Sequence, residues 1–115
     1  MQSFLTSKPR DFTVGENNDV TIKDYGKVQL LDNEMITLVT SNTKCNDIVC
    51  KSWGIYPTQS LNFRQRNEGF KTALICSNDQ KRLYIPLVDT DKMESFFQYL
   101  KKHDKIFLQW LDDFI

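Results

Sequence analysis

Short apolar stretches separated by turn residues are the feature that most constrains what this chain can fold into. Val20 and Ile22 alternate with polar residues, and two further apolar or β-branched stretches follow at 27–31 and 35–40. Turn-forming residues separate the three stretches at 24–26 and 32–34. Links this short join antiparallel neighbours, because a parallel connection needs about a dozen residues. The pattern therefore predicts an antiparallel sheet that begins at Val20.

The second half of the chain continues the β pattern and then changes period. Strands are predicted over 47–53, 70–76 and 82–88, the last two joined as a hairpin by the turn at 77–80. Met93, Phe96, Phe97 and Leu100 then follow the helical spacing i, i+3, i+4 and i+7. This spacing predicts an amphipathic helix that starts near Asp91.

The C-terminal tail fits two periods. Five apolar residues match a helical stripe: Phe107, Trp110, Leu111, Phe114 and Ile115. A short strand would instead place Ile106, Leu108 and Trp110 on one face. The larger number of matches favours the helix. The expected fold class is thus α+β: a mainly antiparallel sheet with a short central helix, and with C-terminal amphipathic helices packed on one face.

Length and composition narrow the class of protein. With 115 residues, 40% of them hydrophobic and 26% charged, we expect a single domain over 1–115, with 1–19 as a loosely ordered arm. No long apolar stretch predicts a membrane span, and the first ten residues do not resemble a signal peptide. Three cysteines without an export signal favour reduced thiols and a cytoplasmic location.

Charge is balanced overall but unevenly distributed. The formal net charge is zero, yet residues 44–82 contain seven basic and three acidic side chains. Residues 1–43 and 83–115 each contain four basic and six acidic side chains. The middle third could therefore present a local basic face, although the same charges could instead solvate several separate faces.

The segment 51–71 is the best candidate for a binding site. Ser60 is a helix N-cap signal and Gly69 a helix stop signal, so a short helix over 60–68 would direct free N–H groups at an anion. Irregular segments such as the one before this helix often contain binding residues. The predicted ligand-binding residues are Trp53, Tyr56, Ser60, Asn62, Arg64 and Lys71.

Signals for catalysis or metal binding are weak. Cys45 and Cys50 lack the tight zinc-knuckle spacing, and His103 is explained by the favourable dipole at a helix end. Asp112 and Asp113 are interpreted as part of a solvated helix face. The glycines form no phosphate-binding loop. We therefore predict no catalytic residue, no metal site and no cofactor.

These observations favour a non-catalytic binding or accessory module that contacts an anionic ligand or a protein partner through 51–71. Two alternatives stay open: a small enzyme or enzyme subunit acting on a phosphate- or sugar-bearing substrate, and a single-stranded nucleic-acid binder. The zero net charge disfavours nucleic acid. The apolar tail also predicts self-association through Trp110, Phe114 and Ile115, unless the tail folds back onto the sheet.

Overall fold

Strands dominate the structure, a computed structural model that describes residues 1–15 and 17–114. About 50% of the chain is strand and 18% helical, so the fold is mostly β and the predicted α+β class is wrong. The strands are β1 (Gln2–Val14), β2 (Val20–Gln29), β3 (Met35–Val39), β4 (Cys45–Lys51), β5 (Gly54–Tyr56), β6 (Phe70–Ser77), β7 (Leu83–Tyr84), β8 (Leu87–Asp89) and β9 (Lys105–Trp110).

Only one helix in the described residues is long. It is α2 (Met93–Lys102), which confirms the helix predicted from its apolar stripe, and a 3₁₀ turn over Thr90–Lys92 precedes it. The Asp89 carboxylate, rather than Asp91, caps this turn by accepting a hydrogen bond from the Asp91 backbone N–H at 2.8 Å. The other helix, α1 (Arg64–Asn67), has a single turn.

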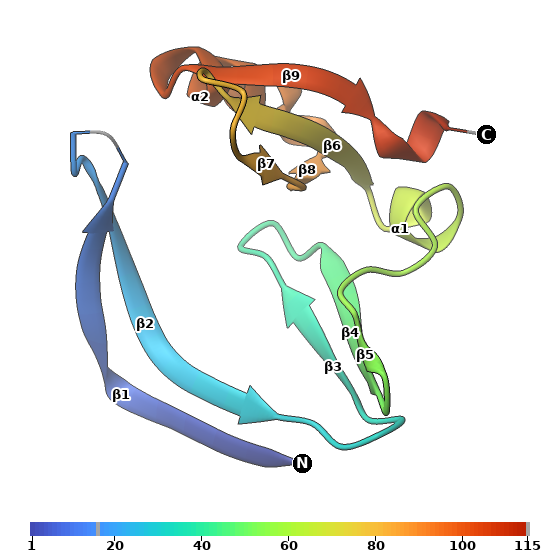
Figure 1. The fold of residues 1–115 in the computed structure, drawn as a ribbon. Helices are drawn as coiled ribbons and strands as arrows, with labels where there is room; N and C mark the ends of the chain where they lie inside the picture. The colour runs from blue at the N-terminus through green and yellow to red at the C-terminus, as the bar shows by residue number, and fades with distance from the viewer. Residues whose placement is uncertain (16, 115) are drawn as a thin grey trace.

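Strands β1 and β2 form a long antiparallel hairpin that stands apart from the other strands (Figure 1). The sequence predicts a loosely ordered arm over 1–19 and a turn at 24–26, but β1 and β2 run through most of both regions. Gly26 lets β2 continue. Its φ of +121° favours glycine, and a Cβ there would meet the Phe4 carbonyl oxygen at 2.1 Å.

Two further antiparallel sheets make up the body of the molecule. One has the order β3-β4-β5, and in the other β6 pairs with β7, β8 and β9. Figure 1 shows α2 lying against the β6 sheet, on the side away from the β3-β4-β5 sheet. The β6 sheet is therefore covered on one face by a helix, and its other face is directed toward the second sheet.

The apolar core lies between α2 and the β6 sheet. Ala73 and Ile75 on β6 pack with Val88 and Leu100, and four partly buried side chains surround them: Met93, Phe96, Phe107 and Trp110. Phe107 and Trp110 are in direct aromatic contact, with ring centroids 4.9 Å apart. Most of the apolar free energy of folding thus comes from this one half of the molecule.

The tail forms a strand where the sequence favours a helix. Residues 105–110 are β9, which pairs with the central strand β6, and only a 3₁₀ turn over Leu111–Asp113 follows. The second C-terminal helix is therefore absent from the described residues. Trp110 is partly buried and packs against the core. Phe114 is exposed, and Ile115 lies outside the described residues.

Lys44 joins the two sheets of the body. It precedes β4, and its Nζ donates to Asp89 at the end of β8 at 2.5 Å and to the Gly69 carbonyl oxygen at 3.0 Å. Lys44 and then the Asn42 amide stabilise the Asp89 carboxylate and lower its pKa to about 2. The same carboxylate raises the pKa of Lys44. Both side chains are largely buried, so solvent screens this ion pair only weakly.

No helix in the described part of the chain has the length and apolar character needed to cross a membrane.

We expect the Lys44–Asp89 ion pair to make stability depend on acid pH. Because the folded pKa of Asp89, about 2, is below its usual 3.8, its contribution is complete above pH 4 and is lost as the pH falls toward 2. The variant Asp89→Asn should be less stable at pH 7 and should lose less stability between those pH values. Urea unfolding at a series of pH values measures both effects. Equal pH profiles for wild type and variant would contradict the expectation.

Candidate functional site

Trp53 and Tyr56 form an exposed aromatic pair at the end of the β3-β4-β5 sheet. Trp53 lies in the tight turn between β4 and β5, and Tyr56 is the last residue of β5. Their rings meet edge to face with centroids 5.1 Å apart. Trp53 is nevertheless 66% exposed and Tyr56 51% exposed, so the pair offers a large apolar contact area to solvent.

Lys51 places a positive charge near this aromatic pair. Its ammonium group donates to the Asn33 side-chain oxygen, and no carboxylate in the described residues forms an ion pair with it. The Asp32 carboxylate instead caps the turn by accepting from the Ser52 backbone N–H at 2.9 Å. The end of the sheet therefore combines exposed aromatic rings with a positive charge that is not neutralised.

Ser60 has the predicted capping contact but does not begin a long helix. Its Oγ accepts from the Arg64 backbone N–H at 3.0 Å, and its carbonyl oxygen accepts from the Gln65 N–H. The helix itself begins at Arg64 and ends at Asn67, instead of covering 60–68. A single turn has almost no macrodipole, so the predicted anion site at a helix N-terminus loses its physical basis.

Arg64 is held by an internal carboxylate. Its guanidinium lies 2.9 Å from Oδ2 of Asp47, a buried residue of β4. The approach is close enough for an ion pair but is not aligned as a hydrogen bond, so this oxygen has no hydrogen-bond partner. The other Asp47 oxygen accepts from the Thr37 hydroxyl at 2.6 Å. Arg64 is therefore needed to neutralise a buried charge.

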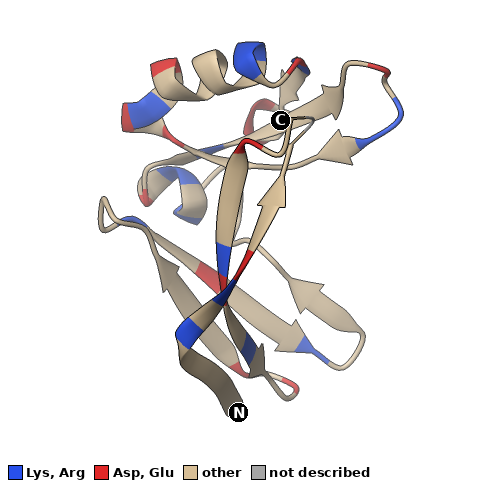
Figure 2. Ribbon diagram, turned by 90° about the vertical axis from the view of Figure 1, so that its left-hand side faces the viewer, with Lys and Arg blue, Asp and Glu red and all other residues tan. Residues whose placement is uncertain are grey.

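Lys71 and Arg66 are also paired within the chain. The Lys71 ammonium lies 3.2 Å from an Asp113 oxygen and 5.0 Å from the centroid of the Trp110 ring. The Arg66 guanidinium lies 3.1 Å from both Asp112 and Asp113. Figure 2 shows basic and acidic residues interspersed along the ribbon. The structure therefore does not bring Arg64, Arg66 and Lys71 together as an open basic face.

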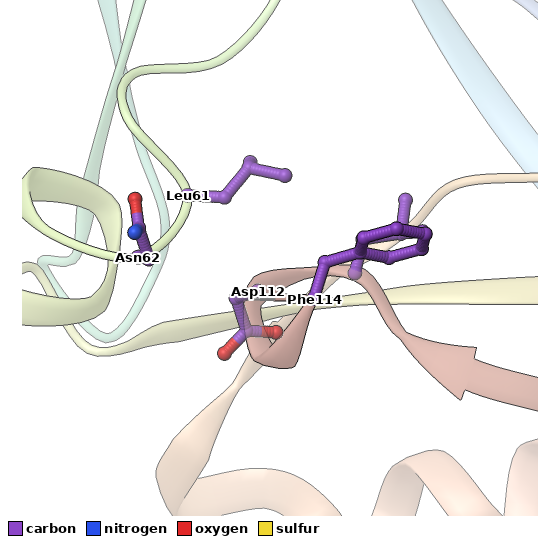
Figure 3. Close-up of a pocket in the computed structure, with 5 residues that line it drawn as sticks. Leu61, Asn62, Asp112 and Phe114 are labelled. Atoms are coloured by element: carbon purple, nitrogen blue, oxygen red, sulfur yellow. The ribbon is translucent and has the colours of Figure 1, made fainter.

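Asn62 lies apart from the aromatic pair, beside a hollow of about 200 Å³. Figure 3 shows Leu61 on one side of this hollow and Phe114 on the other, with Asn62 and Asp112 beside them. The Asp112 carboxylate is already engaged by Arg66 and by the Thr72 backbone N–H. Asn62 is therefore the one polar side chain here that is available to a ligand, which is too few to orient a charged molecule.

A buried polar network joins the two sheets below this hollow. The Gln65 amide donates to the Asn46 side chain at 3.2 Å and accepts from the Thr72 hydroxyl at 2.5 Å. The Thr72 backbone N–H in turn donates to Asp112 at 3.1 Å. Asp112 is only 2% exposed, so its interpretation as part of a solvated helix face is wrong.

The polarity of these residues hid the network from sequence reasoning. Gln65 follows Arg64 in a stretch of charged and amide side chains that is typical of an exposed helix, and Thr72 alternates normally within a strand. No local pattern distinguishes a buried glutamine from an exposed one. Because each member has a hydrogen-bond partner, the network is suited to fixing the packing of the two sheets.

The cysteines and the histidine are dispersed. All three thiols are free, and only Cys76 is fully buried. The His103 ring lies against Tyr99, one turn earlier on α2, with centroids 4.4 Å apart. No group of three potential metal ligands occurs among residues 1–15 and 17–114. The Cys45 and Cys50 thiols donate to backbone carbonyl oxygens rather than to His103.

Comparisons of the chain with protein-family models, with curated proteins and with solved structures gave no match.

We expect Thr72→Val to destabilise the protein by about 1–3 kcal/mol, because it leaves the buried Gln65 amide oxygen without its hydrogen-bond donor. The shape of the side chain is nearly unchanged, so the loss reports the network rather than a cavity. The matched control Thr21→Val on the exposed part of β2 should change stability by less than about 0.5 kcal/mol. Chemical denaturation of both variants measures the difference, and equal effects would contradict a structural role for the network.

Proposed function

We propose that this chain is a non-catalytic binding module that contacts an acidic segment of a partner protein through Lys51, Trp53 and Tyr56. The exposed Trp53–Tyr56 pair is the observation that supports the proposal most strongly. Tryptophan and tyrosine are the residues most enriched among the energetically dominant contacts of protein interfaces. Lys51 lies on the same face of the sheet as Tyr56, and its positive charge favours a partner with carboxylates near its own apolar anchor.

The backbone of β5 adds a second means of contact. β5 is the edge strand of its sheet, and its outer edge pairs with no other strand in the described part of the chain. An extended segment of a partner can hydrogen-bond to such an edge while its side chains meet the neighbouring aromatic rings. With only three residues, β5 would supply orientation, and the aromatic pair would supply most of the affinity.

Internal ion pairing disfavours the other ligands considered. Arg64 neutralises Asp47, and Lys71 contacts Asp113, so a small anion would have to compete with these carboxylates. Single-stranded nucleic acid needs several free cations along its backbone, and the same pairing reduces their number. A protein partner needs only the exposed aromatic area and one free charge. The three free thiols fit a reducing compartment, and we propose the cytoplasm.

We expect Trp53→Ala to weaken binding of acidic, aromatic-containing peptides by at least about 30-fold, because it removes the largest exposed contact area. The probes are peptides selected from a displayed random library on the wild-type protein, and isothermal titration measures their affinity. Lys51→Ala should reduce the affinity less and should remove most of its dependence on salt concentration.

The control is Tyr99→Ala, which removes from α2 a ring that is 50% exposed, close to the 51% of Tyr56, and which should leave peptide affinity unchanged. If the selected peptides are not enriched in acidic residues, the proposal that the partner segment is acidic is wrong. Equal affinity for wild type and Trp53→Ala would remove the aromatic pair from the site.

A further inference from the structure

The part of the β1–β2 hairpin next to its turn, residues 11–14 and 20–23, has one apolar face and one polar face. Cross-strand register pairs Phe12 with Ile22 and Val14 with Val20, which places these four side chains together. The intervening positions form the opposite face and are all polar: Asp11, Thr13, Thr21 and Lys23. A strand pair with this alternation normally buries its apolar face, because each exposed apolar side chain lowers the stability of the fold.

The rest of the chain leaves this apolar face partly exposed to solvent. Phe12 is 36% exposed and Ile22 40% exposed, although each has an apolar cross-strand neighbour. An isolated two-stranded hairpin is only marginally stable in water. Both outer edges of the hairpin are also unpaired in the described residues, because β1 and β2 pair only with each other. Such long open edges are normally covered.

The body presents a matching apolar surface across from the hairpin. Val14 lines a cleft of about 510 Å³ together with Tyr84, Ile85 and Pro86. Ile85 also lines a second cleft of about 410 Å³ between the two sheets, where Leu38 of β3 lies. Figure 1 shows the hairpin on one side of the molecule and the two sheets on the other. We call the apolar residues of this region the concave surface: Phe12, Val14, Val20, Ile22, Leu38 and Ile85.

The dimensions of the chain show how much surface is left open. Its accessible surface is 8567 Å², whereas a compact chain of this size exposes about 6,500 Å². The radius of gyration is 15.7 Å, compared with about 13 Å for a compact domain of this length. The excess of about 2,000 Å² per chain is within the range that each member of a permanent dimer buries.

We propose that a second copy of this chain covers the concave surface, so that the hairpin of each copy packs against the body of the other. The excess area is the argument for an extensive and permanent contact. Charge is compatible with a second copy, because residues 1–29 contain four basic and four acidic side chains and the whole chain is neutral. A two-fold arrangement requires one surface to complement itself, and the concave surface contains both a hairpin face and a body face.

This surface differs from the one proposed for partner binding. Trp53 and Tyr56 lie at the end of the β3-β4-β5 sheet, and none of the concave-surface residues belongs to that turn. A dimer formed through the hairpins would therefore present two aromatic pairs. Loss of dimerisation and loss of peptide binding are separate outcomes, so failure of one proposal does not decide the other.

The test is the mass of the full chain in solution, measured by sedimentation equilibrium between about 1 and 100 µM. We expect wild type to have twice the chain mass throughout this range. Phe12→Asp on the hairpin and Ile85→Asp on the body should each raise the dimer dissociation constant by at least about 100-fold, because either places a charge in an apolar contact. The matched control Thr13→Asp, one residue along on the polar face, should remain dimeric.

If a variant fails to fold, the proposal is tested instead by cross-linking a mixture of ¹⁵N-labelled and unlabelled wild-type chains. We expect links between heavy and light chains that join hairpin lysines to body lysines, such as Lys23 to Lys105. A monomer at about 100 µM would overturn the proposal. So would an unchanged dimer dissociation constant in folded Phe12→Asp and Ile85→Asp, or hairpin-to-body links found only within one copy.

Discussion

The Lys44–Asp89 ion pair is the contact on which the arrangement of the body depends. Lys44 directly precedes β4, whereas Asp89 is the last residue of β8 and caps the turn into α2. The Lys44 ammonium group therefore joins the β3-β4-β5 sheet to the β6 sheet. The Gly69 carbonyl oxygen and the Thr90 hydroxyl accept from the same ammonium. A cation with three internal acceptors has little freedom to shift, so the angle between the sheets is well defined.

Polar contacts hold the two sheets together to an unusual degree. The apolar core lies on the other face of the β6 sheet, beneath α2, and a cleft of about 410 Å³ separates parts of the two sheets. Between them lie the Gln65–Thr72 hydrogen bond and the Arg64–Asp47 ion pair. Hydrogen bonds and ion pairs depend on direction more than apolar contacts do. They therefore specify one relative placement of the sheets while contributing modestly to total stability.

The same kind of ion pair occupies two of the basic side chains in the segment 51–71 that the sequence analysis assigned to an anion, Arg64 and Lys71. The sequence correctly reveals a local excess of cations, but their partners come from distant parts of the chain: Asp47 for Arg64, and Asp113 for Lys71. Pairing across such sequence separations follows from the packing of the sheets, and no local pattern encodes it. Trp53 and Tyr56 were chosen because they border a segment expected to be irregular, whereas in the structure they lie in a turn and in the edge strand β5.

The fold prediction succeeded where the pattern was local and failed where a strand was irregular. The apolar stripe of α2 has a single interpretation, and the structure confirms it. In β9, Phe107 and Trp110 are three residues apart, which is a helical spacing. Yet Ile75 pairs with Phe107 and Ala73 with Trp110, because the register shifts by one residue between these pairs. The bulge directs both rings to the same face and so imitates a helical stripe.

The hairpin shows how a local turn signal can be overruled by pairing along the chain. The turn propensity of residues 24–26 does not end β2. The strand continues through them because Gly26 pairs with Leu5 and Asp24 pairs with Arg10, and the register of the two strands shifts between these two pairs. Gly26 provides the positive φ that this irregularity needs. An arm of this length gains little from contacts with its own body. If a second copy covers its apolar face, as proposed above, the stability of the hairpin is coupled to association.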